Sequence, residues 1–233
     1  MHKSTAGSLR QQVGMIRQFA RRHLDISDLV TEAAAAVYML VIINGYVALS
    51  QLNTQYYYIV ALDIVASIGW GIIDGFTYSL GSSVDRGRQT EMVKKAQESP
   101  TSEKSFKEIM RELEDTFISS FSEDTKKNIT SELLRGSPAA KIRKHKLFTK
   151  GDVAGFASIV EIYLVAGLAL SISYLIIPNK VEAWFVSNLV GIGWLFYFGY
   201  NVGKITGERR ILVGLLTSSA GIVFLVLSYL HYA

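Results

Sequence analysis

The chain has 233 residues, of which 49% are hydrophobic, and its formal net charge is +4. It contains no Cys, which excludes disulfides and thiolate metal sites, so a metal site must use oxygen, His nitrogen or Met sulfur. This apolar composition, concentrated in long runs, is typical of a membrane protein and excludes an ordinary soluble domain.

The N-terminal segment, residues 1–27, is basic and lacks the apolar core and cleavage site of a signal peptide. Leu9, Val13, Ile16 and Ala20 repeat at helical spacing, opposite several arginines. This pattern predicts an amphipathic helix on the membrane surface, in contact with anionic lipid. The alternative is a loosely ordered basic tail.

Five apolar segments follow. Because a bilayer core of about 30 Å requires about 20 mostly apolar residues in one helix, each segment is long enough to cross it. They are Leu29 to Leu52, Tyr57 to Leu80, Val153 to Ile177, Ala183 to Val202 and Ile211 to Leu230. We predict an all-α polytopic membrane protein with transmembrane helices in 28–80 and 153–233, separated by a helical polar domain, 81–152.

The basic residues predict the orientation of the chain. All of the 24 Lys and Arg residues except Lys180 lie in the N-terminal segment, the central polar domain or the turn at 203–210. With five membrane crossings these three regions share one side, which the positive-inside rule identifies as cytosolic. We therefore expect a cytosolic N-terminus and an external C-terminus, in the cell membrane rather than an organelle membrane.

The central domain is predicted to be helical. The sequence DRGRQTEMVKKAQE can continue the second membrane helix, because it has no Pro or Gly after Arg88. Ser102 is a candidate N-cap for an amphipathic helix, and a third helix is expected around Thr125 to Leu134. The basic run KIRKHKLFTK leads back to the membrane and is expected to contact anionic lipid. The apolar face of the amphipathic helix consists of Phe106, Met110, Leu113, Phe117 and Phe121.

Four acids lie within the predicted spans: Glu32, Asp63, Asp74 and Glu161. An ionised carboxylate costs about 3 kcal/mol at mid-bilayer, so each is a candidate for a cation or proton path. Glu32, Asp74 and Glu161 fall in the cytosolic half of three different helices. Asp63 lies in the outer half and shares a helix face with Asp74. The alternative is that each acid bonds locally to a Tyr, Ser or Asn of a neighbouring helix.

Carboxylates that converge repel one another unless a cation or shared protons offset their charge. Oxygen ligands without Cys or membrane-embedded His suit Mn²⁺, Fe²⁺, Mg²⁺ or Ca²⁺ better than Cu⁺ or Zn²⁺. The pattern therefore favours a cation transporter.

Further acids in the central domain could also hold divalent cations. Lys104, Lys107 and Arg111 lie among them, so a salt-bridged, solvated face is an alternative. No phosphate-binding glycine loop or catalytic motif occurs, and we expect no enzymatic activity, no permanently bound cofactor and no nucleic-acid partner. The candidate metal-binding acids are Glu91, Glu98, Glu108, Glu112 and Asp115.

The layout resembles that of the vacuolar iron transporter family from about Asp28 to the C-terminus. GIIDGFTYSLGSSVDRGRQTEM resembles the family's second helix and its exit into the cytosol. GKITGERRILVGLLTSSAGIVFLVLSYL is similar to the family's Thr-Gly turn and Gly-rich last helix. The resemblance implies a homodimer that exports Fe²⁺ or Mn²⁺ from the cytosol in exchange for protons, after capture by cytosolic acids. The pairs Gly71-x-x-x-Gly75 and Gly199-x-x-x-Gly203 allow close helix contact and suggest a dimer face.

The chain departs from the family at two positions. Ala35 stands where the family usually has an Asp in its first helix, and Glu32, one turn away on the same face, is a candidate substitute. The family's metal-binding Met has no counterpart, since no Met occurs between Met39 and Met92. A second hypothesis is therefore a membrane scaffold or partner-binding protein that does not transport.

Overall fold

A computed structural model describes Leu24 and residues 26–49, 56–98, 102–114, 117–137 and 146–232. Helix accounts for 92% of this part of the chain, and no strand occurs in it, which confirms the all-α prediction. The predicted amphipathic helix at the N-terminus lies outside the described residues as far as residue 23. The chain forms two compact units: unit 1 comprises Met1–Ser79 and Lys150–Ala233, and unit 2 is Leu80–Thr149.

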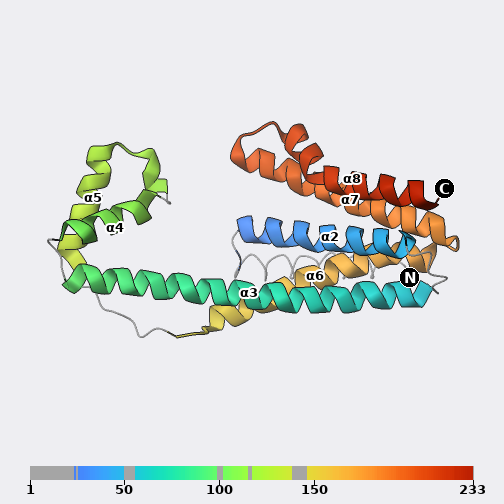
Figure 1. Cartoon of the computed structure of the whole chain (residues 1–233), viewed down its shortest axis with the longest axis horizontal. Helices are drawn as coiled ribbons and strands as arrows, with labels where there is room; N and C mark the ends of the chain where they lie inside the picture. Colours follow the sequence, from blue (N-terminus) through green and yellow to red (C-terminus); the bar gives the residue numbers. More distant parts are fainter. Residues whose placement is uncertain are drawn as a thin grey trace, which may run out of the picture. The chain divides into compact units, whose positions relative to one another are not determined.

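Five helices are long and apolar enough to cross a membrane (Figure 1). They are α2 (Ile26–Leu49), α3 (Tyr56–Glu98), α6 (Lys150–Ile176), α7 (Lys180–Thr206) and α8 (Arg210–Tyr232). Helices α3, α7 and α8 each contain one predicted span in full. Helix α6 ends one residue before the predicted end at Ile177, and α2 is described to Leu49, so the last predicted residues of its span lie outside the described residues. The prediction of five helices long and apolar enough to span a membrane is confirmed. Helix α7 begins and ends outside its predicted span, because Asn179 caps its N-terminus through bonds to the amides of Val181 and Glu182, and Gly207 ends it.

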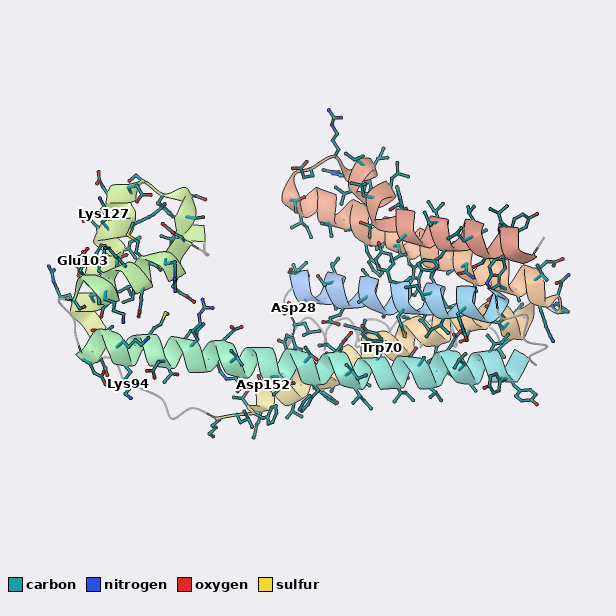
Figure 2. All side chains as sticks on the ribbon, in the orientation of Figure 1. Asp28, Trp70, Lys94, Glu103, Lys127 and Asp152 are labelled. Atoms are coloured by element: carbon teal, nitrogen blue, oxygen red, sulfur yellow. The ribbon has the colours of Figure 1, made fainter. Side chains whose placement is uncertain are left out.

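Large apolar side chains on the outer surface of unit 1 support its placement in lipid. On α3, Trp70, Ile73 and Phe76 are each about half exposed, and comparable residues occur on α6, α7 and α8 (Figure 2). A soluble monomer rarely exposes so continuous an apolar surface.

Helix α2 is the centre of unit 1. It packs against α6, α7 and α8, and its Ala36, Val37 and Leu40 are fully buried. These residues form one core with Ile159 and Leu170 of α6 and with other buried residues. The side chains of α2 therefore face protein on several sides rather than lipid.

Glycines allow the helices of unit 1 to approach closely. A Cβ atom on Gly199 would lie 2.7 Å from the carbonyl oxygen of Val213 on α8, and one on Gly203 would lie 2.8 Å from the Cα atom of Arg210. Gly71 and Gly75 contact α6 in the same way. Close helix contact is therefore confirmed, but the interpretation of these glycine pairs as a dimer face is wrong, because contacts within the chain occupy them.

Unit 2 contains the end of α3, α4 (Glu103–Glu114), the 3₁₀ turn η1 (Phe117–Ser120) and α5 (Glu123–Gly136). Helix α3 continues to Glu98, as predicted, and Ser102 accepts a hydrogen bond from the amide of Lys104 at 3.2 Å, as expected for an N-cap. The third predicted helix corresponds to α5. The amphipathic helix is shorter than predicted, since α4 ends at Glu114 and Phe121, after η1, is 50% exposed.

Candidate functional site

Two of the predicted acids lie within electrostatic range of each other in unit 1. Glu32, in the second turn of α2, and Asp74 of α3 are close enough for their carboxylates to interact electrostatically. Asp28, one turn before Glu32, adds a second negative charge that acts on Glu32. Both Glu32 and Asp74 are partly buried. Like charges repel when both are ionised, so this arrangement favours uptake of a proton or a cation.

Tyr163 of α6 completes what we call the acid–tyrosine cluster: Glu32, Asp74 and Tyr163. Its hydroxyl donates a hydrogen bond to Oδ2 of Asp74, and its side chain is only 2% exposed. The charges of both Asp74 and Glu32 act on this hydroxyl, so the three groups share one environment.

Glycines of α3 bring Tyr163 to Asp74. A Cβ atom on Gly71 would lie 3.0 Å from the Cα atom of Val160 and 3.1 Å from Cβ of Tyr163. One on Gly75 would lie 3.0 Å from the carbonyl oxygen of Phe156. Because neither glycine has a side chain, α6 can lie directly against this face of α3. The two glycines that flank Asp74 in the sequence therefore hold its hydrogen-bond donor in place.

No cation offsets the charge of the cluster within the described part of the chain. Neither Glu32 nor Asp74 forms an ion pair there with Lys, Arg or His. The cluster thus offers carboxylate and phenol oxygens, which are hard ligands suited to protons and to small hard cations.

Asp63 lies elsewhere on α3. Eleven residues separate it from Asp74, or about 16 Å along the helix at ~1.5 Å per residue. It is fully buried, and its Oδ2 accepts a hydrogen bond of 3.1 Å from Ser171 of α6. Among the described residues, neither Oδ1 of Asp63 nor Oγ of Ser67, one turn later, has a hydrogen-bond partner. A buried carboxylate with a free oxygen beside a free hydroxyl is a second candidate position for an ion or a proton.

A polar network joins α2, α6 and α7 in the same unit. The hydroxyl of Tyr174 donates to Oδ1 of Asn44 at 3.1 Å, and Nδ2 of Asn44 donates to Ser187 at 3.3 Å. Nε1 of Trp184 donates to the carbonyl oxygen of Asn44 at 3.0 Å. The Asp63 charge acts on Tyr174, so this network borders the Asp63 position. The members of this network provide hydrogen-bond partners for one another, which fits a role in holding the helices together.

Glu161 does not join the acid–tyrosine cluster. It lies two residues before Tyr163, or about 200° around the helix, so the two side chains leave α6 on nearly opposite sides. Among the described residues, no hydrogen bond, ion pair or charged group acts on Glu161. Of the three acids expected in the cytosolic half, the structure therefore brings two together.

The acids of unit 2 are held by basic residues. Glu112 forms an ion pair with Arg88, and Glu108 lies 3.6 Å from Nζ of Lys95. Glu91 and Glu98 are exposed, and Asp115 lies outside the described residues. Among all the described residues, no three acidic or histidine side chains lie close enough together to hold one metal ion. The salt-bridged face is thus the arrangement found for Glu108 and Glu112, and a metal site here stays a prediction.

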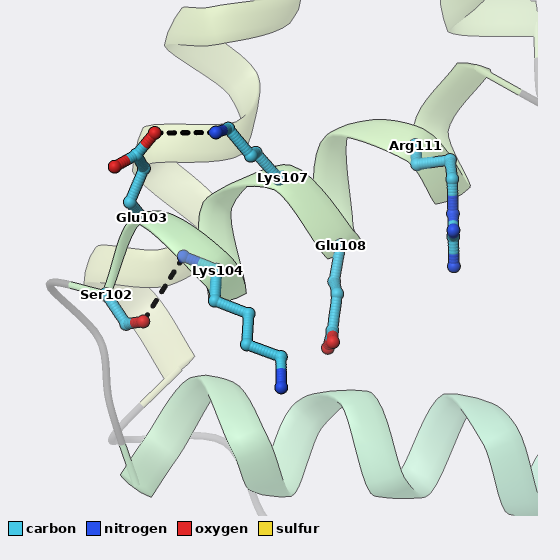
Figure 3. A pocket seen from close by; sticks show the side chains of 6 residues that line it. All are labelled: Ser102, Glu103, Lys104, Lys107, Glu108 and Arg111. Atoms are coloured by element: carbon cyan, nitrogen blue, oxygen red, sulfur yellow. Dashed lines mark hydrogen bonds and ion pairs between the residues drawn. The ribbon is translucent and has the colours of Figure 1, made fainter.

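The first turns of α4 show the same pairing (Figure 3). Glu103 and Lys107 form an ion pair of 2.6 Å, while Lys104, Glu108 and Arg111 point toward α3. The hydrogen bond and charge of Lys107 lower the pKa of the exposed Glu103 carboxyl below its usual value of 4.5. These charged side chains and Ser102 line a pocket. Because acidic and basic groups are mixed around it, the pocket presents no concentrated negative charge to a cation.

Tyr163 was not among the sequence candidates, although the sequence carries a signal for it. On α3, Asp63, Ser67, Gly71, Gly75 and Ser79 recur every four residues. On α6, Tyr163, Gly167 and Ser171 do the same. Small or polar residues at this spacing mark faces where membrane helices touch. Tyr163 is the large residue within its series, and therefore the one able to reach a neighbouring helix.

Comparison of the chain with models of known protein families gave no match, and comparison with curated proteins gave none either.

Proposed function

We propose that the protein is a membrane transporter of divalent cations, with Fe²⁺ or Mn²⁺ as cargo and protons as counter-ions. The observation that supports it best is the acid–tyrosine cluster, in which carboxylates of α2 and α3 approach without a basic residue between them. A structural ion pair would balance charge, whereas two uncompensated acids in an apolar unit require a mobile positive partner.

The cluster suggests how exchange could work. Without cargo, protons bound by the cluster relieve the repulsion between its carboxylates. A divalent cation that enters displaces these protons and takes oxygen ligands from both carboxylates. Tyr163 keeps the Asp74 carboxylate oriented through its hydrogen bond. Protons that return from the other side would release the cation, so each charge state of the pair corresponds to one stage of transport.

Asp63 extends this path toward the other membrane face. It lies on α3 with Asp74, it is fully buried, and one of its oxygens has no hydrogen-bond partner. We assign Asp63 to a second position on the path. Export from the cytosol by a homodimer is what the resemblance to the vacuolar iron transporter family implies, and the Lys and Arg distribution predicts which side is cytosolic.

A flux assay tests the proposal. The full chain is reconstituted in proteoliposomes with a pH gradient, and uptake of Mn²⁺ or Fe²⁺ is followed with a fluorescent indicator. We expect Asp74→Asn and Glu32→Gln to abolish flux, because a neutral amide can neither bind a proton nor balance a dication. Glu161→Gln is the matched control and should retain flux, since Glu161 lies apart from the cluster.

The second hypothesis, a membrane scaffold that does not transport, is favoured by two observations. Asp74 and Asp63 accept hydrogen bonds from Tyr163 and Ser171, which is the local bonding expected of structural acids. The unit 2 acids expected to capture metal include Glu108 and Glu112, and both are paired with basic side chains. Absence of flux with every divalent ion tested, from a folded wild-type protein, would favour the scaffold and reject transport.

A further inference from the structure

The turn between α7 and α8 borders an open cavity of about 680 Å³. Tyr200 of α7 lines one side, and the turn and the start of α8 contribute the other lining residues, which are Glu208, Arg209, Arg210, Ile211, Leu212 and Leu215. Gly207 makes this turn possible, because it ends α7 at φ 78°, in the left-handed region that glycine tolerates. The cavity thus combines a basic end with an apolar groove.

The two arginines at the basic end have no partner among the described residues. Within the described part of the chain, the side chains of Arg209 and Arg210 form no hydrogen bond or ion pair, although Glu208 is adjacent in the sequence. Two arginines of unit 2 differ, since Arg88 and Arg135 are each paired with a glutamate. Glu208 is the acidic residue of the cavity lining, but it pairs with neither guanidinium group among the described residues, and the first turn of α8 contains no acidic residue.

The apolar part of the cavity is exposed. Ile211 is 65%, Leu212 50% and Leu215 51% exposed, and all three belong to the first turns of α8. Since α8 is a membrane-spanning candidate, acyl chains are the natural contact for this surface. An apolar surface that begins directly at two unpaired arginines matches a molecule with an anionic head and a hydrocarbon tail.

We propose that the α7–α8 turn binds one anionic phospholipid. Arg209 and Arg210 hold the phosphate, for which the planar guanidinium offers two parallel N–H donors. One acyl chain lies along Ile211, Leu212 and Leu215, and the Tyr200 ring closes the groove from α7. A basic pocket between membrane helices is a typical headgroup site on an anionic leaflet. This proposal rests on the membrane placement of α7 and α8 and is independent of transport.

Native mass spectrometry of the full chain in detergent tests the proposal, with phosphatidylglycerol and phosphatidylcholine as probes. We expect wild type to retain one phosphatidylglycerol about tenfold more tightly than phosphatidylcholine, since each arginine near a headgroup strengthens binding severalfold. Arg209→Gln with Arg210→Gln should abolish this preference. Arg209→Lys with Arg210→Lys should keep only part of it, because the charge remains while the paired N–H donors are lost.

Lys204→Gln is the matched control. Lys204 lies in the last turn of α7 and is exposed, but it does not line the cavity, so its loss should leave the preference unchanged. Equal retention of the two lipids by wild type would overturn the proposal, and so would an equal effect of the control and the double glutamine variant. Displacement of the lipid by excess inorganic phosphate would also overturn it, since that result would identify a phosphate site without a role for the acyl chain. Leu215→Gln should weaken retention of the lipid, because it removes an apolar contact for the acyl chain, but it should leave the arginines in place.

Discussion

The acidic residues of the two units have different surroundings. In unit 2, Glu108 and Glu112 are partly exposed and pair with Lys95 and Arg88. In unit 1, Asp74 and Asp63 accept hydrogen bonds from Tyr163 and Ser171, and neither has a basic partner within the described chain. Water makes a charge inexpensive in the first case, whereas an apolar environment makes it costly in the second. The comparison indicates that the acids of unit 2 form surface ion pairs, while the acids of unit 1 are available to bind a cation or a proton.

The largest effect on the free energy of unfolding is expected at the contact between α3 and α6, the helices that carry Asp63, Asp74 and their hydrogen-bond donors. A Cβ atom on Gly167 would lie 2.2 Å from Oγ of Ser67 and 3.3 Å from the carbonyl oxygen of Asp63. We expect Gly167→Val to lower the free energy of unfolding by about 3 kcal/mol, because the added atoms force the helices apart. Titration with sodium dodecyl sulfate in mixed micelles measures this change.

Gly69→Val is the control for that variant, since nothing lies within 4 Å of its Cβ position. Its effect should stay within about 0.5 kcal/mol, as for other surface positions. Equal losses in the two variants would contradict the close approach of α3 and α6.

The next effect concerns the acid–tyrosine cluster. Tyr163→Phe removes the donor to Asp74 and leaves a partly buried carboxylate oxygen without its hydrogen bond. We expect the free energy of unfolding to fall by about 2 kcal/mol, as measured by the same titration. Tyr197→Phe is the control, because Tyr197 is 60% exposed and its hydroxyl makes no hydrogen bond in the described structure. A neutral result for Tyr163→Phe would show that Asp74 does not depend on this bond.

A smaller effect is expected from the ion pair in unit 2. The side chains of Arg88 and Glu112 are 55% and 30% exposed. A double-mutant cycle with Arg88→Gln and Glu112→Gln should give a coupling of less than about 1 kcal/mol, which decreases with added salt. Hydrogen exchange of α4 amides in the full chain provides the local stability. A coupling that salt leaves unchanged would remove the contrast with unit 1.

The smallest effect is a pH dependence at the start of α4. Because Lys107 lowers the pKa of Glu103 below 4.5, the pair stabilises the folded state above that pH and loses its effect as the pH falls through the lowered pKa. Lys107→Gln should therefore speed hydrogen exchange in the first turn of α4 at neutral pH. Well below the lowered pKa the variant and wild type should exchange equally, since Glu103 is then protonated in both. A difference that persisted in acid would indicate that Lys107 acts through packing instead of charge.

Much of the fold could be predicted from the sequence, because its signals are local. An apolar run of about 20 residues fixes a membrane span wherever it occurs. The serine before α4 and the uninterrupted stretch after Arg88 likewise predict a cap and a continuing helix. The end of α4 was predicted wrongly. The apolar repeat that suggested a helix as far as Phe121 is periodic in sequence, but the chain leaves the helix at Glu114 and exposes Phe121.

The candidate site was only partly predictable. Residue type and depth identified Glu32, Asp63, Asp74 and Glu161, because an acid in an apolar span is costly wherever it lies. Which acids meet depends on the rotation of each helix about its axis, and packing against other helices sets that rotation. Tyr163 faces Asp74 because Gly71 and Gly75 let α6 approach that face of α3, and Glu161 consequently leaves α6 on the other side.

The sequence by itself determined five spanning helices, a polar helical unit between the second and third, and four acids within apolar segments. Each of these follows from residues that are neighbours along the chain. Only the tertiary structure decided that Glu32 joins Asp74 and Tyr163, that Ser171 bonds to Asp63 and that both glycine pairs serve contacts within the chain. These facts join residues far apart in sequence, whose meeting depends on helix packing that no single segment encodes.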